Sequence, residues 1–172
     1  MTTEALKTTQ ITDLDATPPT KLSAGKGAKG HASRITGFVT TTSGKTTGST
    51  YLLARVPRNA VIKSIVLDSA AMAGSSALDF GVYYATAADG TAGAAVSAAF
   101  FASAVDVSSA VRATDITNES GTYTIDKRNK ELWDACGISA DPGGFLDIVA
   151  TSTATINTGA LFGIEVSYTT GG

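Results

Sequence analysis

Apolar and polar residues alternate along several short segments of the chain from Tyr51 onward, and turn-forming residues separate these segments. In residues 78–84, for example, Leu78, Phe80 and Val82 alternate with smaller or more polar residues. Successive side chains of a β-strand point to opposite faces of its sheet, so a period of two predicts a half-buried strand. The repetition of this period along the chain indicates an all-β fold.

Further strands are expected where β-branched and aromatic residues run between turn signals. They are predicted at residues 51–56, 61–67, 122–126, 145–152 and 161–169, and the last two are expected to form a closing hairpin through residues 157–159. The alanine-rich residues 94–111 fit either a short helix or an irregular edge, and residues 127–135 favour one or two helical turns. Seven or eight short strands at this spacing predict an antiparallel β-sandwich or jelly roll.

Residues 1–50 differ in composition from the rest of the chain. Pro18-Pro19 favours extended backbone, and residues 21–33 combine glycine with lysine and contain few large apolar side chains. Such a segment cannot bury enough apolar surface to fold alone. We therefore expect an extended, mostly irregular basic N-terminal arm at residues 1–50 and a β-sandwich domain at residues 51–172.

The formal net charge of -2 hides a separation of charge along the chain. Residues 16–67 contain eight Lys and Arg and no acid, whereas residues 68–172 contain four bases and twelve acids. This polarity predicts electrostatic docking of the arm, either on an acidic partner surface or on a neighbouring copy, and a solvated basic loop is the alternative. The candidate partner-binding residues are Lys21, Lys26, Lys29, Arg34 and Lys45.

The sequence offers little for catalysis or metal binding. The one histidine, His31, lies in the glycine-rich arm. The one cysteine, Cys136, lies in a segment that is expected to be buried. These residues provide neither a nucleophile with its base nor a four-ligand zinc centre. Residues 25–30 match the string G-x-G-x-x-G, but no strand precedes them and no helix follows. We therefore expect no catalytic residue, no cofactor and no metal.

The chain contains no apolar run near the ~20 residues that a transmembrane helix needs, and its first residues lack the basic start and apolar stretch of a secretory signal. We expect no membrane contact and synthesis in the cytoplasm of the producing cell. The basic arm offers charges for nucleic-acid phosphates, but it contains no aromatic residue before Phe38 on which bases could stack. Nucleic acid is therefore an alternative partner rather than the expected one.

Three stretches of the sequence resemble a group of small virion proteins of tailed bacteriophages. They are residues 52–84, with LLARVPRNAVIKSIVLDSAAM and ALDFGVYY, residues 131–144, with ELWDACGISADPGG, and residues 145–169, with FLDIVATSTATINTGALFGIEVSYT. The order of a strand, a proline-containing turn, a second strand, a Leu-Trp segment with Asp-Pro-Gly and a closing hairpin is similar to that of head decoration, or cement, proteins. This resemblance covers about two thirds of the chain.

The resemblance implies a non-enzymatic β-sandwich or jelly roll that binds the outer surface of a phage head and stabilises neighbouring capsomers. It further implies the major capsid protein as partner, a location on the virion, synthesis in the bacterial host and a homo-oligomer, with a trimer favoured over a dimer. The alternatives are a structural protein of the tail, collar or fibre, a nucleic-acid-associated protein that uses the basic arm, and a carbohydrate-acting enzyme.

Overall fold

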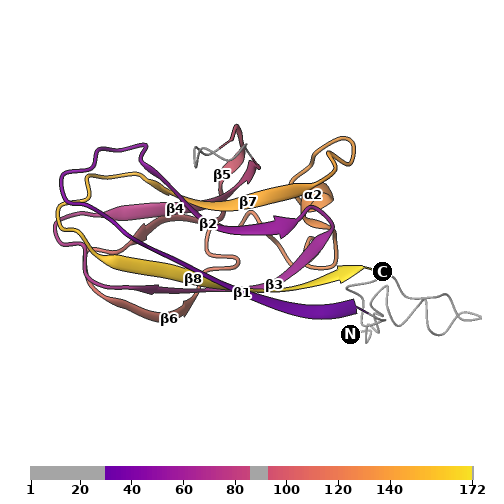
Figure 1. The fold of residues 1–172 in the computed structure, drawn as a ribbon, viewed down its shortest axis with the longest axis horizontal. Coiled ribbons are helices and arrows are strands. Elements are labelled where there is room, and N and C mark those ends of the chain that lie inside the picture. Colours follow the sequence, from indigo (N-terminus) through magenta and orange to yellow (C-terminus); the bar gives the residue numbers. More distant parts are fainter. Residues whose placement is uncertain (1–29, 86–92, 172) are drawn as a thin grey trace, which may run out of the picture.

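The computed structural model describes residues 30–85 and 93–171, which form two four-stranded antiparallel sheets that face each other (Figure 1). The strands are β1 (Gly30–Thr40), β2 (Thr50–Pro57), β3 (Ala60–Ser69), β4 (Ala77–Tyr84), β5 (Ala95–Asp106), β6 (Val111–Asp115), β7 (Phe145–Ser152) and β8 (Leu161–Gly171). One sheet has the order β1-β8-β3-β6, and the other has the order β2-β7-β4-β5. The predicted all-β antiparallel sandwich is confirmed.

The two sheet orders arise from one long hairpin that is wrapped around the core. β1 pairs with β8, β2 with β7, β3 with β6 and β4 with β5, as in a hairpin whose bend lies between β4 and β5. Two more pairings, β3 with β8 and β4 with β7, complete the two sheets. This arrangement is the eight-stranded jelly roll. It places Gly30 opposite Gly171 in the register of β1 and β8.

The core lies between the sheets and is built from alternate strand positions. In β8, every second residue from Phe162 to Tyr168 is buried, as the alternation predicts. Leu78, Phe80 and Val82 of β4 are fully buried in the same apolar cluster. Each large apolar side chain buried in this way contributes roughly 1.5–3 kcal/mol. The core of the sandwich is therefore the main source of its stability.

The edge strands β1 and β2 close one side of the sandwich at Gly37. A Cβ atom at position 37 would lie 1.6 Å from the carbonyl oxygen of Leu53. Leu53 occupies the irregularity of β2 between Leu52 and Ala54, where the register with β7 shifts. Only a residue without a side chain allows two backbones to come this close. Gly37 therefore sets how closely the two sheets meet along this side.

The long connection between β6 and β7 packs on the core and contains the short helix α2 (Leu132–Ala135). Tyr123 of this connection is fully buried, and its ring lies 5.5 Å and 5.3 Å, centroid to centroid, from those of Phe100 and Phe101. Its hydroxyl donates a hydrogen bond of 2.8 Å to the carbonyl oxygen of Ile62. Burial raises the pKa of Tyr123 well above its usual value. The connection is thus part of the folded body.

Residues 30–40 differ from the expectation of an irregular arm. Residues 30–40 form strand β1 and pair with β8 along their whole length. Ile35 and Val39, which lie on the same face of this strand, pack against the core. An edge strand needs few apolar side chains, because one of its faces is exposed to solvent. The sandwich therefore includes residues that were expected in the arm, and residues 1–29 of that arm lie outside the described residues.

Two other local predictions are corrected. Strands β7 and β8 do not form a hairpin, because they belong to opposite sheets and residues 153–160 cross from one sheet to the other. Residues 122–126 form a bend and a turn rather than a strand. Two other expectations are confirmed. The alanine-rich segment forms β5, an edge strand that pairs with β4 through several register shifts, so the irregular edge is the correct one of its two alternatives. Residues 127–135 contain one helical turn, α2.

Candidate interaction surfaces

The five predicted partner-binding residues do not form one described cluster. Lys21, Lys26 and Lys29 lie outside the described residues. Arg34 lies in β1, with a largely exposed side chain whose NH1 is 3.2 Å from Oε2 of Glu165 in β8. Lys45 is exposed and lies in the loop between β1 and β2, where its backbone forms an isolated β-bridge with Ile156. Arg34 and Lys45 thus belong to different parts of the surface.

Two large apolar side chains are exposed next to each other on the outer face of the sheet β1-β8-β3-β6. Phe38 of β1 is 71% exposed and Leu161 of β8 is 54% exposed. In the register of these strands Phe38 lies opposite Gly163, two positions from Leu161, so both side chains project from the same face. Exposed apolar side chains that lie together mark interaction sites more often than isolated ones do.

A hollow of about 430 Å³ lies in this face beside Phe38. Gly163 lies in its lining, and a Cβ atom there would lie 2.7 Å from Cβ of Phe38. Ala70, which directly follows β3, also contributes only a small side chain. The hollow therefore exists because two small residues stand next to two large ones. We call this area, made of Phe38, Ala70, Leu161 and Gly163, the Phe38 patch.

Charged side chains of both signs surround the Phe38 patch. Asp68, Arg112 and Glu165 line the hollow. Asp68 accepts a hydrogen bond of 3.1 Å from the backbone amide of Ala113, and Arg112 NH1 donates one of 2.8 Å to the carbonyl oxygen of Ser69. These bonds hold the two side chains against the sheet. An apolar centre inside a polar, charged rim is the usual anatomy of a protein interface.

The Phe38 patch does not follow from the expected strands, although the sequence carries one signal for it. In β1 the residues that face the core stand at odd positions, such as Ile35 and Val39, whereas Phe38 stands at an even position among exposed residues. A large aromatic residue on the polar face of a strand indicates a surface role. Its partner Leu161 lies 123 positions away, and no local pattern links the two.

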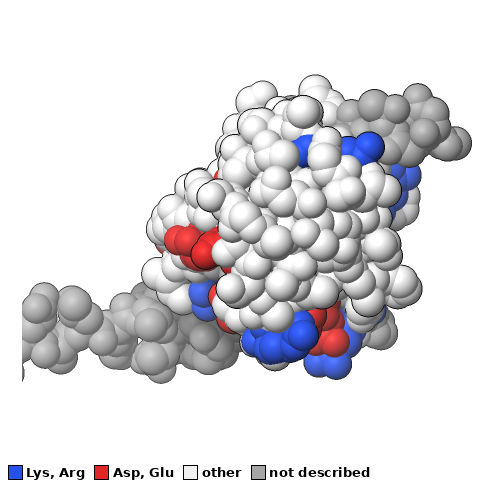
Figure 2. Space-filling model, turned by 90° about the vertical axis from the view of Figure 1, so that its left-hand side faces the viewer, with Lys and Arg blue, Asp and Glu red and all other residues white. Residues whose placement is uncertain are grey.

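One end of the sandwich is almost free of charge. Four loops form it, residues 41–49, 70–76, 107–110 and 153–160, and Lys45 is the one charged side chain among these fully described loops. Figure 2 looks at this end and shows a largely uncharged surface with charged side chains toward its margins. Backbone hydrogen bonds join the loops to one another, among them Gly44 to Ile156 (2.7 Å), Met72 to Val107 (2.9 Å) and Thr158 to Met72 (2.9 Å). This end is therefore a pre-formed surface.

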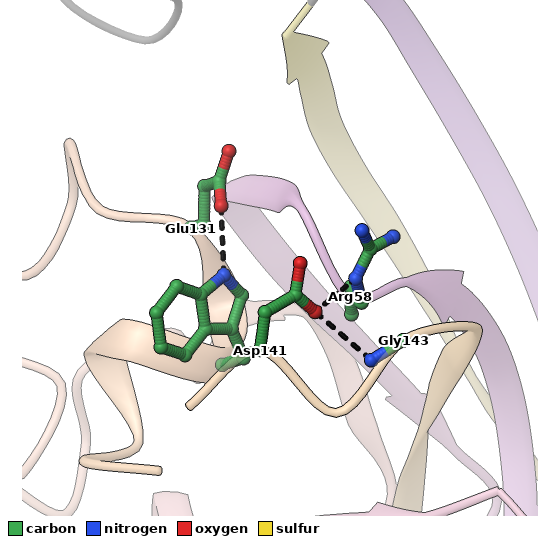
Figure 3. A network of polar contacts seen from close by, with 5 residues as sticks. Arg58, Glu131, Asp141 and Gly143 are labelled. Carbon is green, nitrogen blue, oxygen red and sulfur yellow. Dashed lines mark hydrogen bonds and ion pairs between the residues drawn. The ribbon is translucent and has the colours of Figure 1, made fainter. Parts of the chain in front are cut away.

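A polar network lies where the turn between β2 and β3 meets the connection that precedes β7 (Figure 3). Asp141 accepts hydrogen bonds from Nε of Arg58 and from the amide of Gly143, the latter at 2.9 Å. These donors hold the pKa of Asp141 below its usual value. Beside them, Trp133 Nε1 donates a hydrogen bond of 2.7 Å to Glu131. The network fixes the Leu-Trp and Asp-Pro-Gly segments on the sandwich.

A buried carboxylate lies on the outer face of the other sheet. The side chain of Asp147 in β7 is 2% exposed and faces Arg55 of β2, whose side chain is 47% exposed. Arg55 Nε lies 2.6 Å from Oδ1 and its NH2 lies 2.8 Å from Oδ2 of Asp147, so the pair is bidentate. The hydroxyl of the neighbouring Tyr83 is 2.7 Å from Oγ1 of Thr151, so it forms its hydrogen bond with Thr151 and not with Asp147. The pair links two strands and leaves the guanidinium partly open to solvent.

Cys136 follows helix α2 and is half-buried against the core, in agreement with the expectation of a buried position. Burial raises the pKa of its thiol to about 12, so the thiolate is scarce at neutral pH. His31 pairs with Thr170 in the register of β1 and β8. Within residues 30–85 and 93–171, no group of three or more His, Cys, Asp or Glu side chains is placed to hold a metal ion, and no helix is long and apolar enough to span a membrane.

Comparison with known proteins identifies a similar fold. No family model and no curated protein sequence matches this chain. Among solved structures, a chain of the "Cyanophage Pam1 capsid asymmetric unit" is similar, with a TM-score of 0.51 and 15% sequence identity. The match covers 91% of this chain and 96% of that chain, so the two are nearly equal in length. At this identity the likeness concerns the fold.

Proposed function

We propose that this chain is a non-enzymatic structural protein of a bacteriophage virion that decorates the outer surface of the head. The observation that supports this proposal is the match of its jelly roll to a chain of a cyanophage capsid asymmetric unit along nearly the whole of both chains. Because the match covers 91% of this chain, the likeness is not confined to one part of the jelly roll.

The described surface favours binding over catalysis. One end is almost free of charge and pre-formed, and the outer face of one sheet carries an apolar patch with a charged rim. A surface that is already rigid loses little conformational entropy when it binds a partner. The proposed partners are the major capsid protein and further copies of this chain, in a trimer or a dimer.

The basic residues that precede and enter β1 are the proposed contacts with the capsid. Lys21, Lys26 and Lys29 lie just before β1 in the sequence, and Arg34 lies within it, in a stretch of 52 residues, 16–67, that contains no acid. The Arg34 side chain is exposed, and among the described residues its one ion pair is with the half-exposed Glu165. Exposed pairs of this kind are weak, at about 0–1 kcal/mol, so a carboxylate of the capsid can compete for Arg34.

Binding to phage heads tests this proposal. Heads are prepared from the phage that encodes the protein, and the protein is removed from them. The full chain is then added to these heads, and the bound fraction is measured by sedimentation. We expect saturable binding that the variant K26E/K29E weakens. The variant K127E/K130E changes the net charge equally on the body of the domain and serves as the matched control.

The proposal fails if the chain does not bind heads, or if both double variants bind as well as the unchanged chain. Electron microscopy of virions with the bound chain labelled distinguishes a head location from one on the tail, collar or fibre. Mobility of DNA in the presence of the chain tests the nucleic-acid alternative. Strongly salt-dependent retardation that K26E/K29E abolishes, without binding to heads, would favour that alternative.

A further inference from the structure

The Phe38 patch combines a projecting side chain and a hollow within one small area. Phe38 has 71% of its surface exposed, and the hollow of about 430 Å³ lies directly beside it. This volume equals on the order of ten water molecules at ~30 Å³ each, which gives room for an aromatic ring. The patch therefore contains both a projecting aromatic ring and, beside it, a hollow that can receive such a ring.

We propose that the occupant of this hollow is Phe38 of a second copy of the chain, in a two-fold symmetric pair. In a two-fold interface the same patch is used by both copies, so every contact occurs twice. A projection next to a hollow satisfies this condition, because each copy inserts its Phe38 and receives that of the other. Cyclic trimers need the projection and the hollow on separate surfaces. The pair therefore departs from the trimer that the family resemblance implies.

The size of the sheet face is sufficient for such a pair. With a rise of ~3.3 Å per residue and ~4.8 Å between strands, the outer face of β1-β8-β3-β6 covers roughly 600 Å². Two such faces together bury about 1,200 Å², which is the lower limit of stable, specific interfaces. The contact would be small and centred on few residues, as expected when one aromatic side chain dominates.

The charges around the patch also fit a second copy. Asp68 and Glu165 contribute two negative charges, and Arg34 and Arg112 contribute two positive charges. The rim has no net charge, so two copies do not repel each other when the patches approach.

Sedimentation equilibrium of the full chain over a wide range of concentrations tests this inference. We expect a reversible dimer with twice the 17.4 kDa mass of one chain. The variant F38S should weaken the dimer by on the order of 100-fold or more, since two buried aromatic side chains are lost per dimer. The variant I125S is the matched control, because Ile125 is 76% exposed and lies outside the patch; its dimer should equal that of the unchanged chain.

A second variant tests whether the contact is reciprocal. Ala70→Phe fills the hollow but leaves Phe38 in place, so this variant should be monomeric by itself. A mixture of A70F with F38S restores one of the two contacts, and chains labelled at their N-termini should show energy transfer in the mixture. The test does not depend on the proposed virion role, since a chain that fails to bind heads still dimerises.

Four results would overturn the inference. They are an unchanged chain that stays monomeric at every concentration, a trimer, a dimer that F38S leaves intact, and equal loss of the dimer in F38S and I125S. Circular dichroism spectra of all variants show whether each is folded. If A70F is unfolded, the comparison of F38S with I125S decides alone.

Discussion

The pair of Arg55 and Asp147 predicts that two substitutions at one contact have very different costs. In Arg55→Met, the carboxylate of Asp147, which is 2% exposed in the unchanged chain, loses both of its bonds to the guanidinium. A buried charge that has lost its partner costs about 3–5 kcal/mol. This is a large part of the roughly 5–15 kcal/mol by which a domain is stable.

In Asp147→Leu, the charge that remains is that of Arg55, whose side chain is 47% exposed and can be hydrated. We expect a cost of about 1–2 kcal/mol for the lost charged hydrogen bonds. The double variant, R55M/D147L, removes both charges from this contact. It should therefore be more stable than R55M alone, although it contains one more substitution.

Urea denaturation at neutral pH measures these free energies of unfolding, and an uncharged denaturant avoids screening the ion pair. The four proteins form a double-mutant cycle. The reasoning would be refuted if D147L were as destabilised as R55M, or if the two single effects simply added in the double variant. Either result would mean that the burial of the carboxylate does not determine the energy of the pair.

Two further predictions concern backbone packing and pH. Gly37→Ala should lower the free energy of unfolding by about 1–3 kcal/mol or more, because the new Cβ collides with the carbonyl oxygen of Leu53. The control is Thr36→Ala, at the exposed neighbouring position, which should change the free energy of unfolding by less than about 0.5 kcal/mol. Equal melting temperatures of the two variants would contradict this account. The pKa of Cys136 is raised from 9.0 to about 12 in the folded protein, so the folded state holds its proton more tightly and the stability that this provides is lost as the pH rises from about 9 to about 12. Titration of unfolding against pH should show a shallower alkaline loss for Cys136→Ala than for the unchanged chain, and identical slopes would show that the thiol does not contribute.

The strands with clear alternation could be predicted from the sequence, because burial on one face is recorded in local order. The residues from Phe162 to Tyr168 and from Leu78 to Val82 are of this kind. Strand β1 was missed because an edge strand with one exposed face needs only a few inward residues, such as Ile35 and Val39. The segment around Asn157 carries an ordinary turn signal, and nothing local shows that it crosses from one sheet to the other.

The candidate sites could be predicted only where they depend on composition. The accumulation of bases before residue 68 is visible in the sequence. The Phe38 patch depends on Gly163 being opposite Phe38, and this register is decided by the pairing of the first strand with the last. The bonds between Arg55 and Asp147 likewise join residues 92 positions apart. Such contacts follow from the topology of the jelly roll, which a single sequence does not encode in any local pattern.

The pairing of β1 with β8 also determines when the sheet β1-β8-β3-β6 can form during synthesis. Gly30 finds its partner Gly171 only after β8 has left the ribosome, and β2 must wait for β7 in the same way. Folds dominated by such distant pairings form slowly, and their early strands stay unpaired during synthesis. A growing chain therefore cannot present a finished sheet face, and any surface that joins β1 to β8 arises in a single late step. Chains that lack β8 therefore lack the sheet face on which the Phe38 patch lies.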